Sequence, residues 1–157
     1  MAKKPAAKPK DRVICTAVAP EHAQIIHQQL IELLRKSERY ANGRFLAEDM
    51  VQEIYDQTAY LFCAIKIEDG LPKVLCAVVA SPNPYPRLRM LLVRFLAGDM
   101  ANLYRHNMRE LILKFAREQG FDGIEWAGRQ GWFRWLPGAR PIGIVGEIRF
   151  GRRGEQE

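Results

Sequence analysis

The sequence predicts an α/β fold, a mixed and mostly antiparallel sheet with helices on both of its faces. Three observations lead to this prediction. Short β-type runs and helical stretches follow one another in the order β-α-α-β-β-β-α-β-α-β. Two neighbouring runs are joined by Asp69-Gly70, a signal for a tight antiparallel hairpin. A strong amphipathic helix then crosses over to another run, which should lie parallel to the strand before that helix.

The N-terminal part of the domain supplies one strand and two helices. Residues 12–18 form a short β-type run. Pro20 and Glu21 give good start chemistry for a helix, and apolar residues then recur at helical spacing through Lys36. A shorter helix is predicted from about Leu46 to Asp56.

The middle of the chain supplies the hairpin and a further strand. The hairpin strands are predicted at 60–67 and 73–80. Residues 81–86 contain three prolines, which predicts a stiff loop because proline cannot donate to a strand ladder. Residues 87–96 form the next strand, which Gly98 ends.

The strongest helix is predicted at 99–119, with Asp99 as its N-cap and Gly120 as its C-terminal stop. Its apolar stripe consists of Tyr104, Met108, Leu111, Ile112 and Phe115. Three short elements complete the order: a strand at 124–127, a turn or two of helix at 130–136 and a glycine-broken strand at 142–150.

Composition predicts one globular domain at 12–150 between a basic tail at 1–11 and a polar tail at 151–157. The net charge is +6, and the tail residues Lys3, Lys4, Lys8 and Lys10 supply most of it. Such a tail could contact DNA phosphates or an acidic protein surface, or it could simply aid solubility. We predict no membrane span and no signal peptide. The predicted location is a virion or a host cytoplasm.

The three cysteines predict buried, reduced thiols. Cys15, Cys63 and Cys76 lie in apolar runs and lack C-x-x-C or Cys/His spacing. This spacing argues against a zinc site and against a disulfide framework, so we predict no metal.

The junction Lys114–Glu125, where the long helix ends at a glycine and passes into a strand, resembles the GNAT acetyltransferase fold. The element order agrees over roughly 12–150. The resemblance implies that acetyl-CoA binds at the N-terminus of the long helix, where a glycine-rich loop presents backbone amides to its pyrophosphate. The corresponding loop here lacks the small residues, with Leu103 and Arg105 in their places. We therefore leave the cofactor-binding residues open and expect no cofactor; the degenerate loop is Met100, Ala101, Asn102, Leu103, Tyr104 and Arg105.

The resemblance also implies a general base near the central strands and an acid, often tyrosine, after the strand at 124–127. No tyrosine follows Tyr104. Several residues could serve as a base and none stands out, so we assign no catalytic residue. The candidates are Glu125, Glu53, Asp56, Glu68 and His106. His22 and His27 lie five apart on the first helix, a poor spacing for ligands on one helical face.

All three tryptophans lie between Trp126 and Trp135. The turn after the strand resembles a G-R-x-G-W-x-R-x-L pattern in a group of GNAT-like tailed-bacteriophage proteins. The matching residues are Gly128, Arg129, Gly131, Trp132, Arg134 and Leu136. Trp132 is expected in the core, whereas exposed Trp135 beside arginine would be typical of a protein interface, or would stack on nucleic-acid bases. The predicted interface is Arg129, Trp132, Phe133, Arg134 and Trp135.

From these observations the first expectation is a non-enzymatic GNAT-like phage virion or assembly protein, a degenerate acyltransferase that docks to other structural proteins or to packaged DNA. A homo-oligomer is compatible with this role. The alternative is an active N-acetyltransferase that uses acetyl-CoA. A small nucleic-acid-binding or host-directed regulatory protein is the third expectation.

Overall fold

The computed structural model describes residues 12–99, 101–128, 136–143 and 145–150. The chain divides into two units with the boundary after Trp126. In the second unit, the described residues form a turn but no helix or strand. The strand predicted at 142–150 is therefore wrong for residues 142–143 and 145–150: no described strand pairs with their backbone, and their apolar side chains are exposed. The prediction of one domain over 12–150 stays a prediction.

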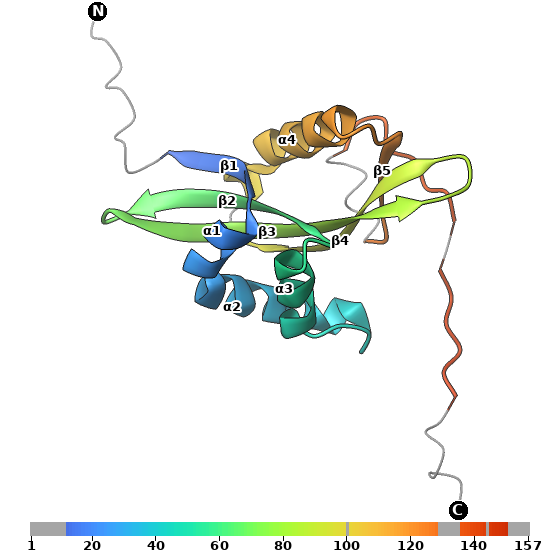
Figure 1. Ribbon diagram of the computed structural model, residues 1–157, viewed down its shortest axis with the longest axis horizontal. Coiled ribbons are helices and arrows are strands. Elements are labelled where there is room, and N and C mark those ends of the chain that lie inside the picture. Colours follow the sequence, from blue (N-terminus) through green and yellow to red (C-terminus); the bar gives the residue numbers. More distant parts are fainter. Residues whose placement is uncertain (1–11, 100, 129–135, 144, 151–157) are drawn as a thin grey trace, which may run out of the picture. The chain divides into compact units, whose positions relative to one another are not determined.

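The first unit contains a sheet of five strands in the order β1-β2-β3-β4-β5. Strands β1 to β4 pair antiparallel in sequence, and β5 pairs parallel with β4. The mixed, mostly antiparallel sheet and its parallel last strand were both predicted, and both are confirmed (Figure 1). The strands are β1 Val13–Val18, β2 Tyr60–Glu68, β3 Leu71–Pro84, β4 Arg89–Gly98 and β5 Gly123–Trp126.

Helices cover both faces of this sheet, as predicted. Helix α4 (Arg105–Glu118) lies on one face (Figure 1). The opposite face carries α1 (Pro20–Ile25), α2 (His27–Ser37) and α3 (Ala47–Tyr55). The described residues also form two 3-10 turns, η2 at Glu38–Ala41 and η3 at Ala101–Leu103. None of the described helices is long and apolar enough to cross a membrane.

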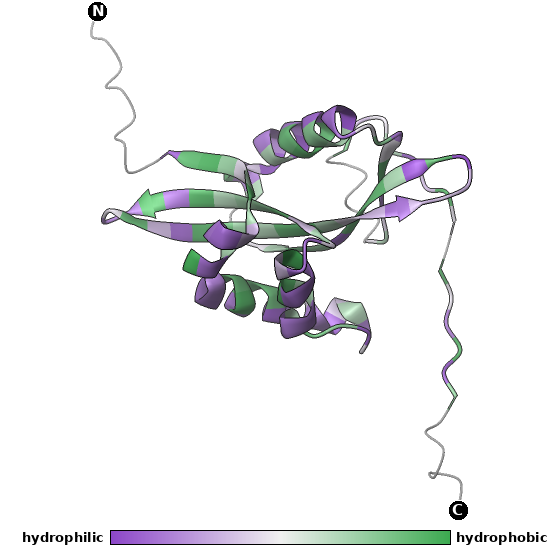
Figure 2. Ribbon diagram, viewed as in Figure 1, coloured by the Kyte–Doolittle hydropathy of each residue, from purple (hydrophilic) through white to green (hydrophobic). Residues whose placement is uncertain are grey.

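Each face of the sheet has its own hydrophobic core, and β3 contributes to both. Ala77 and Val79 pack towards α2 and α3, whereas Cys76 and Val78 pack towards α4. Strand residues alternate between faces, so a strand covered on both sides needs an unbroken apolar run, and β3 has one from Val74 to Ala80. The helices show both hydrophilic and hydrophobic colours around each turn, as expected for amphipathic helices with one buried side (Figure 2).

The predicted hairpin is confirmed, but its second strand is longer than expected. Asp69 and Gly70 form the turn with φ of 51° and 76°, the left-handed conformation that Asp-Gly favours. Strand β3 then continues through Pro82 and Pro84, where a loop was predicted. The reason lies in the pairing: β2 begins at Tyr60 opposite Ala80, so beyond Ala80 only β4 pairs with β3 among the described strands. A proline without an N–H is tolerated where one side of the strand has no partner.

Two helix predictions need correction. The helix predicted to run through Lys36 bends at Ile26, which leaves the helical conformation (φ −103°, ψ 14°) with its side chain buried. The long helix begins at Arg105, so Asp99 is not its N-cap. The Asp99 N–H donates to the Leu75 carbonyl at 3.0 Å, which keeps the chain beside β3 after Gly98. The apolar stripe of this helix is confirmed by its packing against the sheet.

Candidate functional site

The sheet opens between β4 and β5, and this opening is the first feature of the candidate site. The two strands pair from Met90 opposite Gly123 to Val93 opposite Trp126. Beyond Val93, β4 continues to Gly98 with β3 as its partner. In the described part of the chain, residues 94–98 therefore have a strand on one side only. Their backbone donors and acceptors on the other side can pair with a bound molecule.

A β-bulge marks the point where β4 leaves β5. The register with β3 shifts, because Val93 lies opposite Ala80 whereas Phe95 lies opposite Val79. The additional residue is Arg94, and both Arg94 and Phe95 consequently face α2 and α3. Bulges of this kind redirect side chains and are common beside active sites.

The Arg94 side chain is held by two groups on the helical side of the sheet. Its guanidinium forms an ion pair with Glu53 of α3 and lies 4.3 Å from the centre of the Phe45 ring. The side chains of Arg94 and Glu53 are 16% and 30% exposed, so the pair is accessible from one side. This contact places a carboxylate and a guanidinium next to the opening.

Glu125 lies on the same face, one residue before the end of β5. Ile124 and Trp126 pack towards α4, so Glu125 projects to the opposite face. Its Oε1 atom accepts hydrogen bonds from Asn83 Nδ2 at 2.6 Å and from the Tyr85 hydroxyl at 2.8 Å. The hydrogen bond to the Glu125 carboxylate raises the pKa of Tyr85. Both donors use the same carboxylate oxygen, Oε1.

The N-terminus of α4 lies directly after β4 in the chain. Tyr104 is the N-cap residue, and the Met108 N–H donates to its carbonyl at 2.8 Å. The N–H groups of residues 106 and 107 precede this bond and have no acceptor within the helix. Of the predicted loop, Met100 lies outside the described residues. Leu103 is 43% exposed and Arg105 is exposed, whereas Tyr104 is buried.

Tyr104 packs in the core on the α4 side of the sheet, and neither Cys76 in that core nor Cys63 in the opposite core is a reactive thiol. Burial raises the pKa of Tyr104 and raises the pKa of Cys76 to about 12. Cys63 is buried and its pKa is also raised, and all three cysteines are free of disulfides. At neutral pH these thiols are protonated, and it is the thiolate that reacts. The prediction of buried, reduced thiols is confirmed for Cys63 and Cys76, whereas Cys15 is partly exposed.

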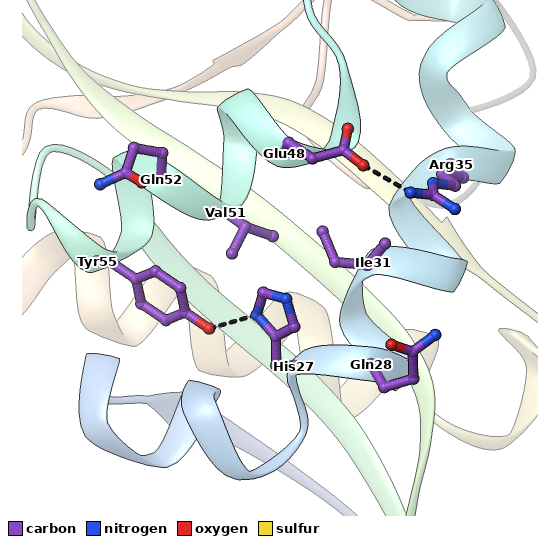
Figure 3. A pocket seen from close by; sticks show the side chains of 8 residues that line it. All are labelled: His27, Gln28, Ile31, Arg35, Glu48, Val51, Gln52 and Tyr55. Atoms are coloured by element: carbon purple, nitrogen blue, oxygen red, sulfur yellow. Dashed lines mark hydrogen bonds and ion pairs between the residues drawn. The ribbon is translucent and has the colours of Figure 1, made fainter.

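A groove between α2 and α3 forms a second, separate feature (Figure 3). Its volume is about 310 Å³. The His27 Nδ1 atom and the Tyr55 hydroxyl are hydrogen-bonded at 2.6 Å towards one end, and Arg35 pairs with Glu48 at 2.6 Å towards the other. Within the described residues, no cluster of His, Cys, Asp or Glu could hold a metal ion.

The structure places two of the remaining predicted residues apart from the opening. Glu68 pairs with Lys73 in the hairpin at 3.4 Å, and Asp56 accepts a hydrogen bond from Gln52. His106 differs from these two, because it is exposed in the first turn of α4, next to the opening in the chain. The predicted interface Arg129, Trp132, Phe133, Arg134 and Trp135 lies outside the described residues, and so do Lys3, Lys4, Lys8 and Lys10.

Sequence reasoning missed Asn83 and Tyr85, because the predicted proline loop gave no reason to place them beside Glu125. It also missed the pairing of Arg94 with Glu53. An arginine in an apolar strand is a signal that could have been used, since a charged side chain facing a core needs a partner.

No protein-family model matches the sequence, and no curated protein matches it. Solved structures do match. An aminoglycoside acetyltransferase from an uncultured soil metagenomic sample, in complex with trehalose, is 15% identical with a TM-score of 0.63, over 92% of this chain and 100% of that chain. A ribosomal-protein-alanine N-acetyltransferase from Brucella melitensis biovar Abortus 2308 is 17% identical with a TM-score of 0.60, over 89% of this chain and 100% of that one.

A GCN5-related N-acetyltransferase from Ralstonia eutropha JMP134 is 12% identical with a TM-score of 0.60, over 89% of this chain and 100% of that one. At these identities the likeness shows the fold, which is the GNAT fold. It overturns the expectation of a non-enzymatic phage virion or assembly protein, because these three structures are acetyltransferases and nothing in them indicates a phage particle. The comparison favours the enzymatic alternative.

Proposed function

We propose that the chain is an N-acetyltransferase that binds acetyl-CoA at the opening between β4 and β5 and acetylates an amine. The observation that supports this proposal best is the opening itself, with its one-sided strand at residues 94–98 followed by the N-terminus of α4. Acetyl-CoA, when bound, would supply the acetyl group. The GNAT fold of the chain and the acetyltransferase activity of proteins with that fold point the same way.

The residues around the opening fit the chemical groups of acetyl-CoA. The pantetheine arm contains amides, which can pair with the open side of β4 as a further strand would. The N–H groups of residues 106 and 107 and the positive end of the helix dipole favour the pyrophosphate. Arg105 adds a positive charge in this first turn.

Glu125 is the best placed general base. It lies beside the last paired residues of β4 and β5, on the face that also carries the carboxylate of Glu53. Because Arg94 neutralises Glu53, the net negative charge on this face is that of Glu125, and it favours a substrate that arrives as an ammonium ion. The Glu125 carboxylate can take a proton from the ammonium, directly or through one water, which leaves a neutral nitrogen able to attack the acetyl carbon. The carbon–sulfur bond of the thioester would break as the carbon–nitrogen bond forms, and coenzyme A would leave as the thiol with the further proton that the nitrogen loses. Asn83 and Tyr85 hold the carboxylate in place.

The test has a binding part and a kinetic part. Isothermal titration should show acetyl-CoA binding to the wild-type chain, and radiolabelled acetyl-CoA with a panel of primary amines should show transfer. Glu125→Gln should lower kcat by about a hundredfold or more while leaving the acetyl-CoA affinity unchanged. Glu68→Gln is the matched control, because Glu68 lies in the hairpin turn region. Absence of acetyl-CoA binding by the wild-type chain would refute the proposal.

A further inference from the structure

Strand β1 is an outer strand of the sheet, and one of its sides is open. It pairs with β2 alone, from Val13 opposite Lys66 to Val18 opposite Leu61 (Figure 1). Among the described residues, no backbone–backbone hydrogen bond outside this ladder reaches the strand. The backbone donors and acceptors on the outer side of β1 can therefore pair with another strand.

The composition of β1 does not protect this edge. Native sheets commonly block a free edge with proline or with charged side chains. Among the described strands, β3 beyond Ala80 has a free edge that follows this rule, because Pro82 and Pro84 have no N–H to donate. Val13–Val18 contains neither a proline nor a charged residue, and hydrophobic residues are visible along it in Figure 2. Such an edge is typical of a strand that pairs with another chain.

The side chains of β1 alternate between the two helical layers. Val18 packs into the core on the side of α1 to α3, whereas Val13 and Cys15 pack into the core on the side of α4. By alternation, Ile14 faces the first layer and Ala17 faces the second. Ile14 is 47% exposed and Ala17 is exposed as well. Each face of the edge therefore has one apolar side chain that is not covered.

A second copy of the chain fits this edge when the two β1 strands run antiparallel about a twofold axis at Thr16. The axis is perpendicular to the sheet, so residues opposite each other face the same side. Ile14 of one copy then lies opposite Val18 of the other, and Ala17 lies opposite Cys15. Each uncovered side chain thus gains an apolar neighbour, and both copies use the same residues.

Charges at the two ends of β1 favour the same arrangement. Arg12 precedes the strand and Glu21 lies in the first turn of α1; both are exposed, and neither forms an ion pair with another described residue. In the antiparallel pairing, Arg12 of one copy lies opposite Pro20 of the other, on the side where α1 begins. It is then beside Glu21 of that copy, and symmetry repeats the contact. Opposite charges on paired strands stabilise the pairing.

We infer that β1 pairs with β1 of a second copy, so that two five-stranded sheets join into one. The opening between β4 and β5 lies at the other end of the strand order, so the inferred interface does not involve it. The inference does not use acetyl-CoA and is independent of the proposed acetyltransferase activity. The paired strands are short, so we expect a dissociation constant in the micromolar range.

The test is sedimentation equilibrium of the full chain at about 1–200 μM. The wild-type chain should be dimeric at the upper end of this range. Arg12→Glu should raise the dissociation constant about tenfold, because it places like charges together twice in the interface, and Glu21→Arg should do the same. The double variant Arg12→Glu/Glu21→Arg should return to within about threefold of the wild-type value, since it only exchanges the charges.

Ile14→Lys should leave the chain monomeric, because a lysine at a strand edge opposes pairing. Leu71→Lys is the matched control, since Leu71 is an exposed leucine of β3, which is not an outer strand. Melting followed by circular dichroism should show that all variants remain folded. A monomeric wild-type chain at about 200 μM would overturn the inference. A dimer that survives Ile14→Lys, or a double variant that dimerises no better than the single variants, would overturn it too, because the contact would then lie elsewhere.

Discussion

At the scale of single residues, Gly98 shows how tightly the end of β4 is packed. A Cβ atom at this position would lie 2.5 Å from the Leu75 carbonyl oxygen, 2.8 Å from the Cys76 Cα and 2.8 Å from the Tyr104 hydroxyl. Two of these neighbours are backbone atoms of β3, which cannot move without disturbing the sheet. Glycine is required here by close approach and not by a left-handed backbone.

Gly98→Ala should therefore lower the free energy of unfolding by about 1–3 kcal/mol, as overpacking does in other cores. Urea unfolding followed by circular dichroism measures the change. Gly143→Ala is the matched control, because nothing lies within 4 Å of a Cβ at that position. Equal stability of the two variants would mean that β3 and β4 separate more easily than the packing suggests.

Single residues also mark the limit of sequence reasoning at the site. Glu125 was among the candidate bases because it lies on the strand after the long helix, and that strand was placed correctly. Its partners Asn83 and Tyr85 are about 40 residues away in sequence and meet it only through the pairing of β3, β4 and β5. Side-chain periodicity reports the face of one element, and it carries no information on which distant side chains converge.

At the scale of elements, the end of α4 is attached to the beginning of β4. Arg89 Nη1 donates to the Gln119 carbonyl at 2.6 Å, and its guanidinium lies 4.0 Å from the centre of the Phe121 ring. Next to it, the Asp122 N–H donates to the Arg89 carbonyl and the Asp122 carboxylate accepts from the Arg89 N–H, both at 2.8 Å. These contacts fix where β5 begins, and hence how far it pairs with β4.

Arg89→Gln should remove the side-chain part of this attachment and leave the backbone part. We expect a loss of about 1 kcal/mol, because the bond involves a charged donor but is exposed. Hydrogen exchange should increase at residues 119–123 more than in the rest of the sheet. Arg117→Gln is the control, since Arg117 is an exposed arginine in the last turn of α4. Uniform exchange across the unit would contradict a local role for Arg89.

Element types were predictable where the apolar period was long, and element ends were less so. The stripe of α4 and the hairpin at Asp69-Gly70 carry strong local signals. The start of α4 does not, because Gly98 and Asp99 are held beside β3 by contacts far away in sequence. The prolines at 82 and 84 led to the wrong prediction of a loop, because proline has no N–H to donate. Whether a strand needs that donor depends on whether another strand pairs with it on that side, which the local sequence does not show.

At the scale of the whole molecule, buried groups that must stay neutral make the free energy of unfolding fall as the pH becomes alkaline. In the folded state the pKa of Cys76 is about 12 against an ordinary 9.0, and the pKa values of Cys63 and Tyr104 are also raised by burial. Above about pH 9 the unfolded chain loses these protons while the folded chain keeps them. The contribution is complete below that pH and is lost as pH rises towards the folded pKa values.

Urea unfolding should therefore show stability falling between about pH 9 and pH 12, by up to about 1.4 kcal/mol per pH unit for each group. Cys76→Ala should make this dependence less steep by the share of one group. Cys76→Ala should also lower the free energy of unfolding near neutral pH, because the smaller side chain packs less well. This loss does not affect the test, since the stability of each variant is followed relative to its own value at neutral pH. A free energy of unfolding that stays level over this range would show that these groups are accessible to hydroxide in the folded protein.

Because of the bulge, Arg94 is an additional residue of β4 that has no residue opposite it in β3. Removing Arg94 would leave Val93, Phe95 and Ala97 on the faces that they already occupy. Removing Leu92 or Leu96 would instead turn part of the strand over, so that side chains facing α4 would face α2 and α3, and the reverse. Arg94 is thus the position in β4 where evolution can gain or lose a codon without inverting the strand. Alignments of homologous chains are expected to place their gaps in this strand there.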